Sequence, residues 1–379
     1  MSKDITTSDQ LNVTALHQAH REFDAQMVQF AGWEMPARYG SALREHQAVR
    51  SSAGMFDVSH MGRLYIDGEG AEGLLDRVLT ANVRVLEEGQ ARYCLACRED
   101  GGILDDLIVY RLGPEGYLVV CNAANREVIL AVIRRSAESV PEASIADRTM
   151  ETAMIAVQGP RAVETLARIS LLAPEALPSF HCTHGDVLGQ RMLVARTGYT
   201  GEDGVELIME ADAARRLWAA LIEAGVTPCG LVARDSLRLE AALRLWGNDM
   251  DTSVNPYEVG LGRFVDLNKG DFIGNVALSM VREQGVSKRL VGFEMVGRGI
   301  PRNGFPILEN DVVIGRVTSG GHSPTLDKNI GLGFVPPSRA EKGTPLTIYI
   351  RGRHVQAKVV SLPFYRRTRP ECVEGPPPK

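Results

Sequence analysis

Residues 101–110 read Gly101-Gly102-Ile103-Leu104-Asp105-Asp106-Leu107-Ile108-Val109-Tyr110, an acidic pair inside an apolar run. The two glycines and the Ile, Leu and Val that follow predict a turn leading into a buried strand. Because side chains alternate across a strand, Asp105 and Asp106 should face opposite sides, with Asp106 on the side of Tyr110. A buried carboxylate is unfavourable without partners. Two interpretations stay open locally: a carboxylate that satisfies backbone donors at the strand end, or a functional group.

Strands and helices alternate irregularly around this run. We predict strands at 62–67, 91–97, 103–110 and 116–121, and helices at 70–80 and 123–137. A second block adds strands at 154–159, 191–197 and 204–210, and helices at 160–170, 211–224 and 231–245. This order predicts an α+β fold rather than a repeating βαβ sheet.

The chain becomes β-rich after residue 288. Turns rich in Gly, Pro, Asn and Asp separate short apolar segments at 289–294, 312–318, 330–335, 345–351 and 354–361. This spacing is typical of a small all-β barrel or sandwich. We therefore expect an α+β region of two interleaved lobes over 14–275, a linker near 275–288, a β-barrel domain over 288–368 and a disordered tail over 370–379.

Composition excludes several classes of protein. The 379 residues carry a formal net charge of −5, which gives no support for nucleic-acid binding. No apolar stretch approaches the roughly 20 residues that span a bilayer, and the polar N-terminus does not resemble a secretory signal. Six cysteines are too few for a disulfide framework in a chain of this length, so we expect a reducing cytoplasm and no membrane partner.

Three short motifs favour structural roles. Residues 68–73 match GxGxxG, but two glutamates in the loop would repel a pyrophosphate. Cys94 and Cys97 form a CxxC whose side chains should lie on opposite faces of a strand, so we expect no metal site there. Asp57, Ser59 and His60 are too close in sequence to predict a nucleophilic triad, and a hydrogen-bonded turn is the better interpretation.

Two further segments carry candidate ligand contacts. Residues 196–206 form a Gly-rich turn in which Tyr199 could stack on a planar ring, followed by the carboxylate of Glu206 in an apolar strand. That carboxylate could accept two parallel hydrogen bonds from an amidine-like edge, such as that of a pterin. Arg234, near the start of its helix, could bind a carboxylate or carbonyl oxygen. The alternatives are a hairpin with a solvated face and an ordinary intrahelical ion pair.

Taken together, the motifs resemble the T-protein (aminomethyltransferase) family of the glycine cleavage system from about residue 30 to 366. They are FAGWEMP, AVRSSAGMFDVSHMG, GGILDDLIVY, VVCNAANRE, AVQGP, RTGYTGEDGVEL, ARDSLRLEA, GNDMD, NPYEVGLGRFV, KGDFIG, TSGGHSPTL and PFYR. The resemblance implies a three-lobed folate-binding aminomethyltransferase fold with a C-terminal all-β barrel. It implies tetrahydrofolate as the one-carbon acceptor, no metal, and the lipoylated H-protein as partner. The one-carbon unit of aminomethyl-lipoyl H-protein would give 5,10-methylenetetrahydrofolate, ammonia and dihydrolipoyl H-protein.

The resemblance also implies roles for single residues. Asp106 matches the catalytic aspartate of the family. Glu206 and Arg234 match its folate-contacting positions. Residues expected in the same cavity are Tyr110, Asn122 and Tyr199, and Arg366 is expected to meet the glutamyl tail or the H-protein.

Two related functions compete with this interpretation. One is a non-catalytic folate-binding protein of the same superfamily, which carries a Lys-Gly-Cys-Tyr-type motif where this chain has Lys269-Gly270-Asp271-Phe272. The other is a folate-dependent demethylase, or the folate half of a methylamine oxidase. The oxidases add a flavin-binding unit for which this chain has no convincing fingerprint.

Overall fold

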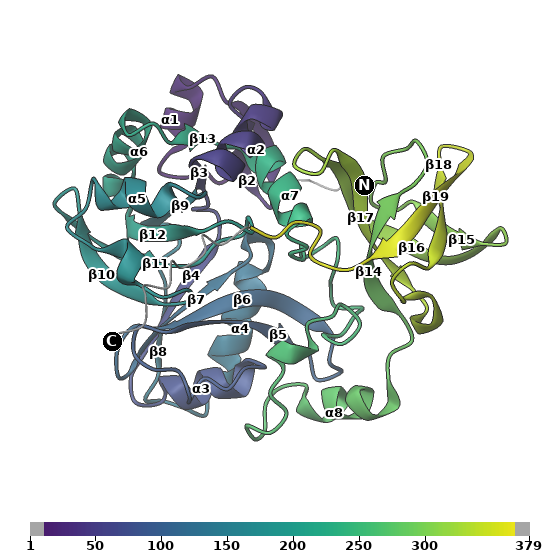
Figure 1. The fold of residues 1–379 in the computed structure, drawn as a ribbon. Coiled ribbons are helices and arrows are strands. Elements are labelled where there is room, and N and C mark those ends of the chain that lie inside the picture. The colour runs from purple at the N-terminus through teal and green to yellow at the C-terminus, as the bar shows by residue number, and fades with distance from the viewer. Residues whose placement is uncertain (1–10, 368–379) are drawn as a thin grey trace, which may run out of the picture.

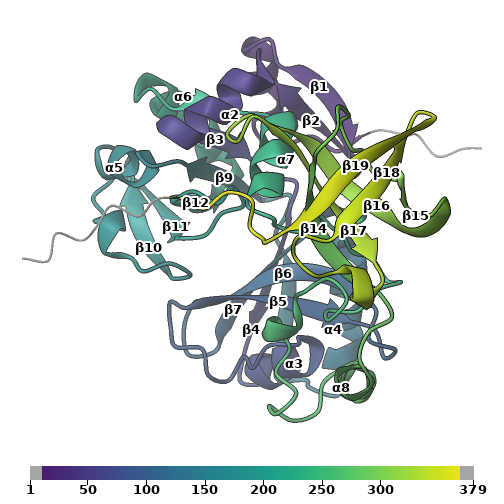
Figure 2. The ribbon, with the colours of Figure 1, turned by 45° about the vertical axis from the view of Figure 1, so that its right-hand side comes forward.

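The chain folds into three lobes, which Figures 1 and 2 show from two sides. The computed structural model describes residues 11–367, so the tail predicted at 370–379 lies outside the described residues. One lobe is built on a five-stranded sheet, one on a six-stranded sheet, and the third is a closed barrel of six strands. The α+β class and the C-terminal barrel are therefore confirmed.

The first sheet is antiparallel and has the order β5-β6-β7-β4-β8. Its strands are β4 (Gly62–Asp67), β5 (Ala91–Cys97), β6 (Ile103–Arg111), β7 (Gly116–Cys121) and β8 (Ser144–Asp147). Helices α3 (Ala71–Val78) and α4 (Arg126–Ala137) cover one face, where leucines and isoleucines of both helices join one buried cluster with the sheet. The strand predictions at 62–67, 91–97 and 116–121 are confirmed.

The second sheet has the order β10-β11-β12-β9-β3-β13. Its strands are β3 (Gly54–Asp57), β9 (Thr152–Gln158), β10 (Cys182–Val187), β11 (Gln190–Ala195), β12 (Gly204–Glu210) and β13 (Thr227–Pro228). Apolar residues of α1 (His17–Glu22), α5 (Ala162–Ala167) and α6 (Ala214–Glu223) pack on its outer face. All pairings are antiparallel except that of β13 with β3.

The inner faces of the two sheets pack against each other. Phe56 and Ala156 of the second sheet lie in one cluster with Tyr110, Leu118 and Val120 of the first. Helices α2 (Ala42–Ser51) and α7 (Leu231–Glu240) contact each other at the side of this sandwich, beside the hairpin of β1 (Gln26–Phe30) and β2 (Trp33–Arg38). The strand that carries the acidic pair, β6 of the first sheet, thus lies between the helices α3 and α4 on one face and the second sheet on the other. Figure 1 shows β6 between α4 and the strands of the second sheet.

The barrel closes in the order β14-β17-β16-β15-β18-β19. Its strands are β14 (Arg289–Met295), β15 (Pro306–Glu309), β16 (Val312–Ser323), β17 (Lys328–Val335), β18 (Pro345–Ile350) and β19 (Arg353–Val360). Its interior contains a cluster around Phe293 and Ile348. A second cluster joins Leu332 and Phe334 of the barrel to Leu95 and Ile103 of the first sheet, which fixes the barrel against the lobes.

Several sequence predictions were wrong in detail. The helix predicted over 231–245 ends at Glu240, and Ala242 has a φ of 55° that no α-helix adopts. The expected linker near 275–288 contains a helix, α8 (Asn275–Gln284). The N-terminal hairpin and β15 were not predicted. Short 3₁₀ turns occur at Ala123–Asn125, Pro174–Ala176, Ala211–Ala213, Gly262–Phe264 and Pro337–Arg339.

Candidate active site around the acidic pair

A bulge in β6 immediately precedes the acidic pair. Ala96 pairs with Asp105 and Cys97 pairs with Ile103, so Leu104 is an extra residue in the strand. Beyond it the alternation is regular, and Asp105 faces the α3–α4 side while Asp106 faces the interior of the protein. Bulges bend a strand and re-aim its side chains. The bulge therefore sets the direction in which the two carboxylates point.

Asp106 is partly exposed and has two side-chain donors. The hydroxyl of Tyr93 donates to Oδ2 over 2.9 Å, and Nδ2 of Asn122 donates to Oδ1 over 2.8 Å. Burial raises the pKa of the Asp106 carboxyl, while these two hydrogen bonds oppose the rise. A carboxyl group with a raised pKa, held by fixed donors and reachable by a ligand, has the properties of a functional acid or base.

Asp105 is completely buried and fully hydrogen-bonded. Its carboxylate accepts hydrogen bonds from the backbone N–H of Asn122 (2.9 Å), from Nδ2 of Asn122 (2.8 Å) and from Nδ2 of Asn125 (2.6 Å). Burial raises its pKa, as does the neighbouring Asp106 charge, and these donors oppose both effects. Asp105 thus fixes the start of the segment after β7, and through it the amide that holds Asp106.

Glu206 lies on β12 with 6% of its surface exposed. The hydroxyl of Thr197 donates to its Oε2 over 2.5 Å, and the hydroxyls of Thr197 and Tyr110 are 3.2 Å apart. Burial raises the pKa of Glu206, and the Thr197 hydrogen bond and the charge of Arg234 lower it. Tyr110 itself is completely buried. Its hydroxyl reaches the site through Thr197, and its place beside a bound ligand stays a prediction.

Arg234 and Tyr199 lie together between Glu206 and Asp106. The guanidinium of Arg234 sits over the Tyr199 ring at 4.6 Å from its centroid, and the Tyr199 hydroxyl donates to the carbonyl of Arg244. Within residues 11–367 the guanidinium of Arg234 has no hydrogen bond or carboxylate partner. The intrahelical ion pair considered from sequence forms instead between Asp235 and Arg238, over 2.8 Å. Tyr199 lies within electrostatic range of Asp106 as well as of Arg234.

Three residues of this neighbourhood were missed in the sequence. They are Tyr93, Thr197 and Asp249. Tyr93 pairs with Ile108 across the β5–β6 ladder and reaches Asp106 diagonally, a contact that the hairpin register could have indicated. Arg238 and Asp249 form a buried ion pair of 2.7 Å behind Tyr199. Nothing in the local sequence indicated that pair.

Arg366 is not brought into this cluster. Its side chain is exposed, and its Nη2 donates to the carbonyl of Leu362 over 3.4 Å. The guanidinium of Arg50 lies over the ring of the adjacent residue, Tyr365, at 4.1 Å from its centroid. The Tyr365 hydroxyl lies beside Glu202. This C-terminal segment therefore meets the lobes through Tyr365.

The weaker motifs have structural roles. Gly68 has a φ of +108°, and a Cβ on Gly70 would meet Val140, so glycine is needed there for packing. Cys94 and Cys97 are buried in two different clusters on the two sides of their strand. The backbone N–H of Ser59 donates to Asp57, which makes the expected turn.

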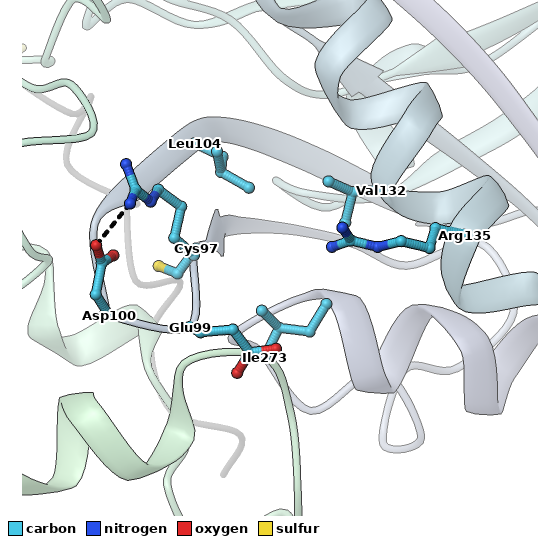
Figure 3. A pocket seen from close by; sticks show the side chains of 8 residues that line it. Cys97, Glu99, Asp100, Leu104, Val132, Arg135 and Ile273 are labelled. Atoms are coloured by element: carbon cyan, nitrogen blue, oxygen red, sulfur yellow. Dashed lines mark ion pairs between the residues drawn. The ribbon is translucent and has the colours of Figure 1, made fainter.

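A separate hollow of about 400 Å³ lies near the β5–β6 turn (Figure 3). Cys97, Leu104, Val132 and Ile273 form its apolar part, and its rim includes the 2.9 Å ion pair of Arg98 with Asp100. Neither member of the acidic pair lines it. The hollow is therefore distinct from the cluster around Asp106.

The cluster combines groups that suit a flat, polar ligand. It offers an anionic acceptor in Glu206, a cation in Arg234, an aromatic ring in Tyr199 and a second carboxylate in Asp106. Among residues 11–367 no group of three or more His, Cys, Asp or Glu side chains could hold a metal ion. No helix of the described part of the chain is long and apolar enough to cross a membrane.

The chain matches known proteins over nearly its whole length. The model of the GCVT N-terminal domain matches residues 16–269, and that of the glycine cleavage T-protein C-terminal barrel domain matches residues 288–366. The aminomethyltransferase of Rubrobacter xylanophilus is 48% identical over 360 residues, which are 95% of each chain. That of Synechococcus sp. is 47% identical over 94% of this chain and 99% of its own.

A solved structure agrees with the sequence relatives. The crystal structure of glycine cleavage system aminomethyltransferase T from Bartonella henselae superposes with a TM-score of 0.90 at 34% identity, covering 95% of this chain and 100% of that one. The chain therefore belongs to the aminomethyltransferase family, the T-proteins of the glycine cleavage system.

Proposed function

We propose that this aminomethyltransferase moves the one-carbon unit of aminomethyl-lipoyl H-protein to tetrahydrofolate. The carbon leaves the lipoyl sulfur and becomes bonded to two folate nitrogens, while the amino group leaves as ammonia and the lipoyl arm is left as dithiol. The products are 5,10-methylenetetrahydrofolate, ammonia and dihydrolipoyl H-protein. The observation that carries this proposal is a partly exposed carboxylate, Asp106, fixed by Tyr93 and Asn122 near the aromatic ring of Tyr199, which carries the Arg234 guanidinium over its face.

The two ends of the cluster have different tasks. Glu206 accepts hydrogen bonds from the amino and ring N–H groups of the pterin, and Arg234 binds an oxygen of the same ring system. Tyr199 supplies a flat contact surface. These contacts bring the folate nitrogens to Asp106, and holding two reactants in place in this way contributes roughly 7–11 kcal/mol.

Asp106 acts where the bonds change. Its carboxylate accepts a hydrogen bond from a folate N–H and so orients the nitrogen that attacks the one-carbon unit. Positive charge that develops on the carbon and its nitrogens is stabilised by the same carboxylate, because Tyr93 and Asn122 hold it in place before the reaction begins.

Turnover and folate affinity should separate the two roles. With purified aminomethylated H-protein, the Asp106→Ala variant should bind tetrahydrofolate measurably but lose most formation of methylenetetrahydrofolate and ammonia. The Glu206→Ala variant should instead weaken tetrahydrofolate binding first. Asp100→Ala, which alters an exposed carboxylate of the same hairpin, is the matched control and should behave as wild type.

Two results would contradict the proposal. Wild-type-like turnover by Asp106→Ala would remove that residue from the mechanism, and unchanged affinity in Glu206→Ala would remove the pterin contact. A folded wild-type protein that binds tetrahydrofolate but forms no product would favour a non-catalytic folate-binding protein.

A further inference from the structure

Three buried side chains form a hydrogen-bonded row that joins the two sheets. Tyr110 comes from β6 of the first sheet, Glu206 from β12 of the second, and Thr197 from the turn between β11 and β12. The exposed fractions are 0% for Tyr110, 5% for Thr197 and 6% for Glu206. The hydroxyls of Tyr110 and Thr197 are 3.2 Å apart, and that of Thr197 is 2.5 Å from Oε2 of Glu206.

The row has one direction when Glu206 is ionised. A carboxylate only accepts hydrogen bonds, so Thr197 must donate its single hydroxyl proton to Glu206. The oxygen of Thr197 is then left to accept, and the protonated hydroxyl of Tyr110 donates to it. Burial and the Glu206 charge raise the pKa of Tyr110, which keeps that proton in place. Such a row strengthens each of its hydrogen bonds.

The backbone around Thr197 is fixed independently. Nε2 of Gln158 donates to the Thr197 carbonyl over 3.1 Å, and Oε1 of Gln158 accepts from the Thr200 hydroxyl over 2.9 Å. A Cβ on Gly198 would collide with the Gln158 amide. These contacts hold the backbone of Thr197 in the position from which its hydroxyl reaches Glu206.

Glu206 keeps acceptor capacity for a ligand, most of it on Oε1. Oε2 is held by Thr197, whereas no residue in the described range 11–367 donates to Oε1. The groups that influence the charge of Glu206 are Arg234 of α7 and Tyr110 of β6; behind them lie His60, close to Arg234, and Cys182 of β10, close to Tyr110. Arg234 is the only cation among them that acts on Glu206 directly.

We propose that Thr197, oriented by Tyr110, is a positioning residue that keeps Glu206 anionic and aims Oε1 at the N–H groups of the bound pterin. This inference rests on the proposed function, because it takes Glu206 as the pterin contact. It adds Thr197 and Tyr110 as residues that act through Glu206. It also requires that Glu206 is ionised and that both hydroxyls keep their protons when the ligand binds.

The test is tetrahydrofolate affinity as a function of pH. Thr197→Val keeps the shape of the side chain but leaves Glu206 without its donor, so affinity at pH 7 should fall about 10- to 100-fold. The pKa of Glu206 should rise further in this variant. The ratio of variant to wild-type Kd should therefore grow as pH is lowered, whereas titration of tetrahydrofolate itself cancels in the ratio.

Rescue variants and controls complete the experiment. Thr197→Ser retains the hydroxyl and should restore most of the affinity, and Tyr110→Phe should change the ratio in the same direction by a smaller factor. Thr165→Val and Tyr117→Phe are matched controls, because Thr165 and Tyr117 are buried, hydrogen-bonded residues outside the cluster. Both controls should have the wild-type Kd at every pH.

Opposite outcomes separate this inference from the function on which it rests. Suppose that wild type binds tetrahydrofolate and that Glu206→Ala weakens binding. The inference is then wrong if Thr197→Val and Tyr110→Phe leave the affinity unchanged, or lower it by a factor that does not depend on pH. If wild type does not bind, or Glu206→Ala binds as wild type does, the proposed function is wrong. Circular dichroism of each variant checks that a changed Kd does not reflect unfolding; if Thr197→Val does not fold, Tyr110→Phe decides.

Discussion

Removal of the Asp249 carboxylate should loosen the barrel from the lobes and destabilise the protein. Asp249 is completely buried in the segment after α7. Its Oδ2 accepts from Nη1 of Arg238 over 2.7 Å and from the backbone N–H of Leu245 over 3.0 Å. Its Oδ1 accepts from the Thr318 hydroxyl of barrel strand β16 over 2.6 Å. Arg238 also donates to Ser319 of the same strand over 2.8 Å.

The expected loss of stability follows from these contacts. Asp249→Ala leaves the guanidinium of Arg238 buried without its main counter-charge, and breaking a buried pair in this way costs about 3–5 kcal/mol. Arg238 keeps Asp235 and Ser319 as acceptors, each at 2.8 Å, which places the expected loss near the lower end of that range, about 3 kcal/mol. Replacement of both partners, in Arg238→Met with Asp249→Leu, should cost less than Asp249→Ala alone.

Urea unfolding followed by circular dichroism measures this loss, and a double-mutant cycle isolates the interaction of the pair. Asp251→Ala is the control, since within residues 11–367 its carboxylate accepts hydrogen bonds from Ser253, two residues on, and from no other residue. Its loss should change stability by less than about 1 kcal/mol. A loss below about 1 kcal/mol in Asp249→Ala, or additive effects in the double variant, would refute the reasoning.

Three further predictions concern the site and Asp57 of strand β3. Tyr93→Phe removes a donor that lowers the pKa of Asp106, so the acid limb of the turnover–pH profile should move to higher pH, and an unmoved limb would contradict this. Gly198→Ala places a Cβ against Gln158 and should weaken tetrahydrofolate binding in titrations while the circular dichroism spectrum stays that of wild type. Burial would raise the pKa of Asp57, but hydrogen bonds from His20 and other groups outweigh it and hold that pKa at about 2. The ionised carboxylate therefore stabilises the fold by about 2 kcal/mol above pH 4, and this stabilisation is lost as the pH falls towards 2. The thermal midpoint of Asp57→Asn should therefore fall less between pH 4 and 2 than that of wild type.

Secondary structure was predictable wherever a short-range pattern controls it. Strands at 91–97 and 116–121 occur with the predicted bounds, because runs of apolar and β-branched residues between turns leave few alternatives. The helix at 231–245 was predicted too long, since leucines keep helical spacing beyond Glu240 while Ala242 adopts a positive φ. The short strand β15 was missed because it begins with a proline and has only four residues.

At the site, too, one property of the two carboxylates was predictable from the sequence and another was not. Alternation along the strand assigned Asp105 and Asp106 to opposite sides, and the structure bears this out. The bulge at Leu104 was not predictable, because it depends on how β6 pairs with β5 rather than on β6 alone. Tyr93 was missed for the same reason, since its contact with Asp106 exists only in one register of that hairpin.

The sequence by itself determined the strand, the presence of two carboxylates in it, the side that each one faces and, through the order of its motifs, the family. Tertiary structure decided what each carboxylate does. Asp105 became a buried structural acceptor because Asn122 and Asn125 fold back onto it. Asp106, held by Tyr93 and Asn122, stayed partly exposed and keeps acceptor capacity for a ligand. The physical reason is that local periodicity fixes the direction of a side chain, whereas its pKa and availability depend on donors that distant segments bring to it.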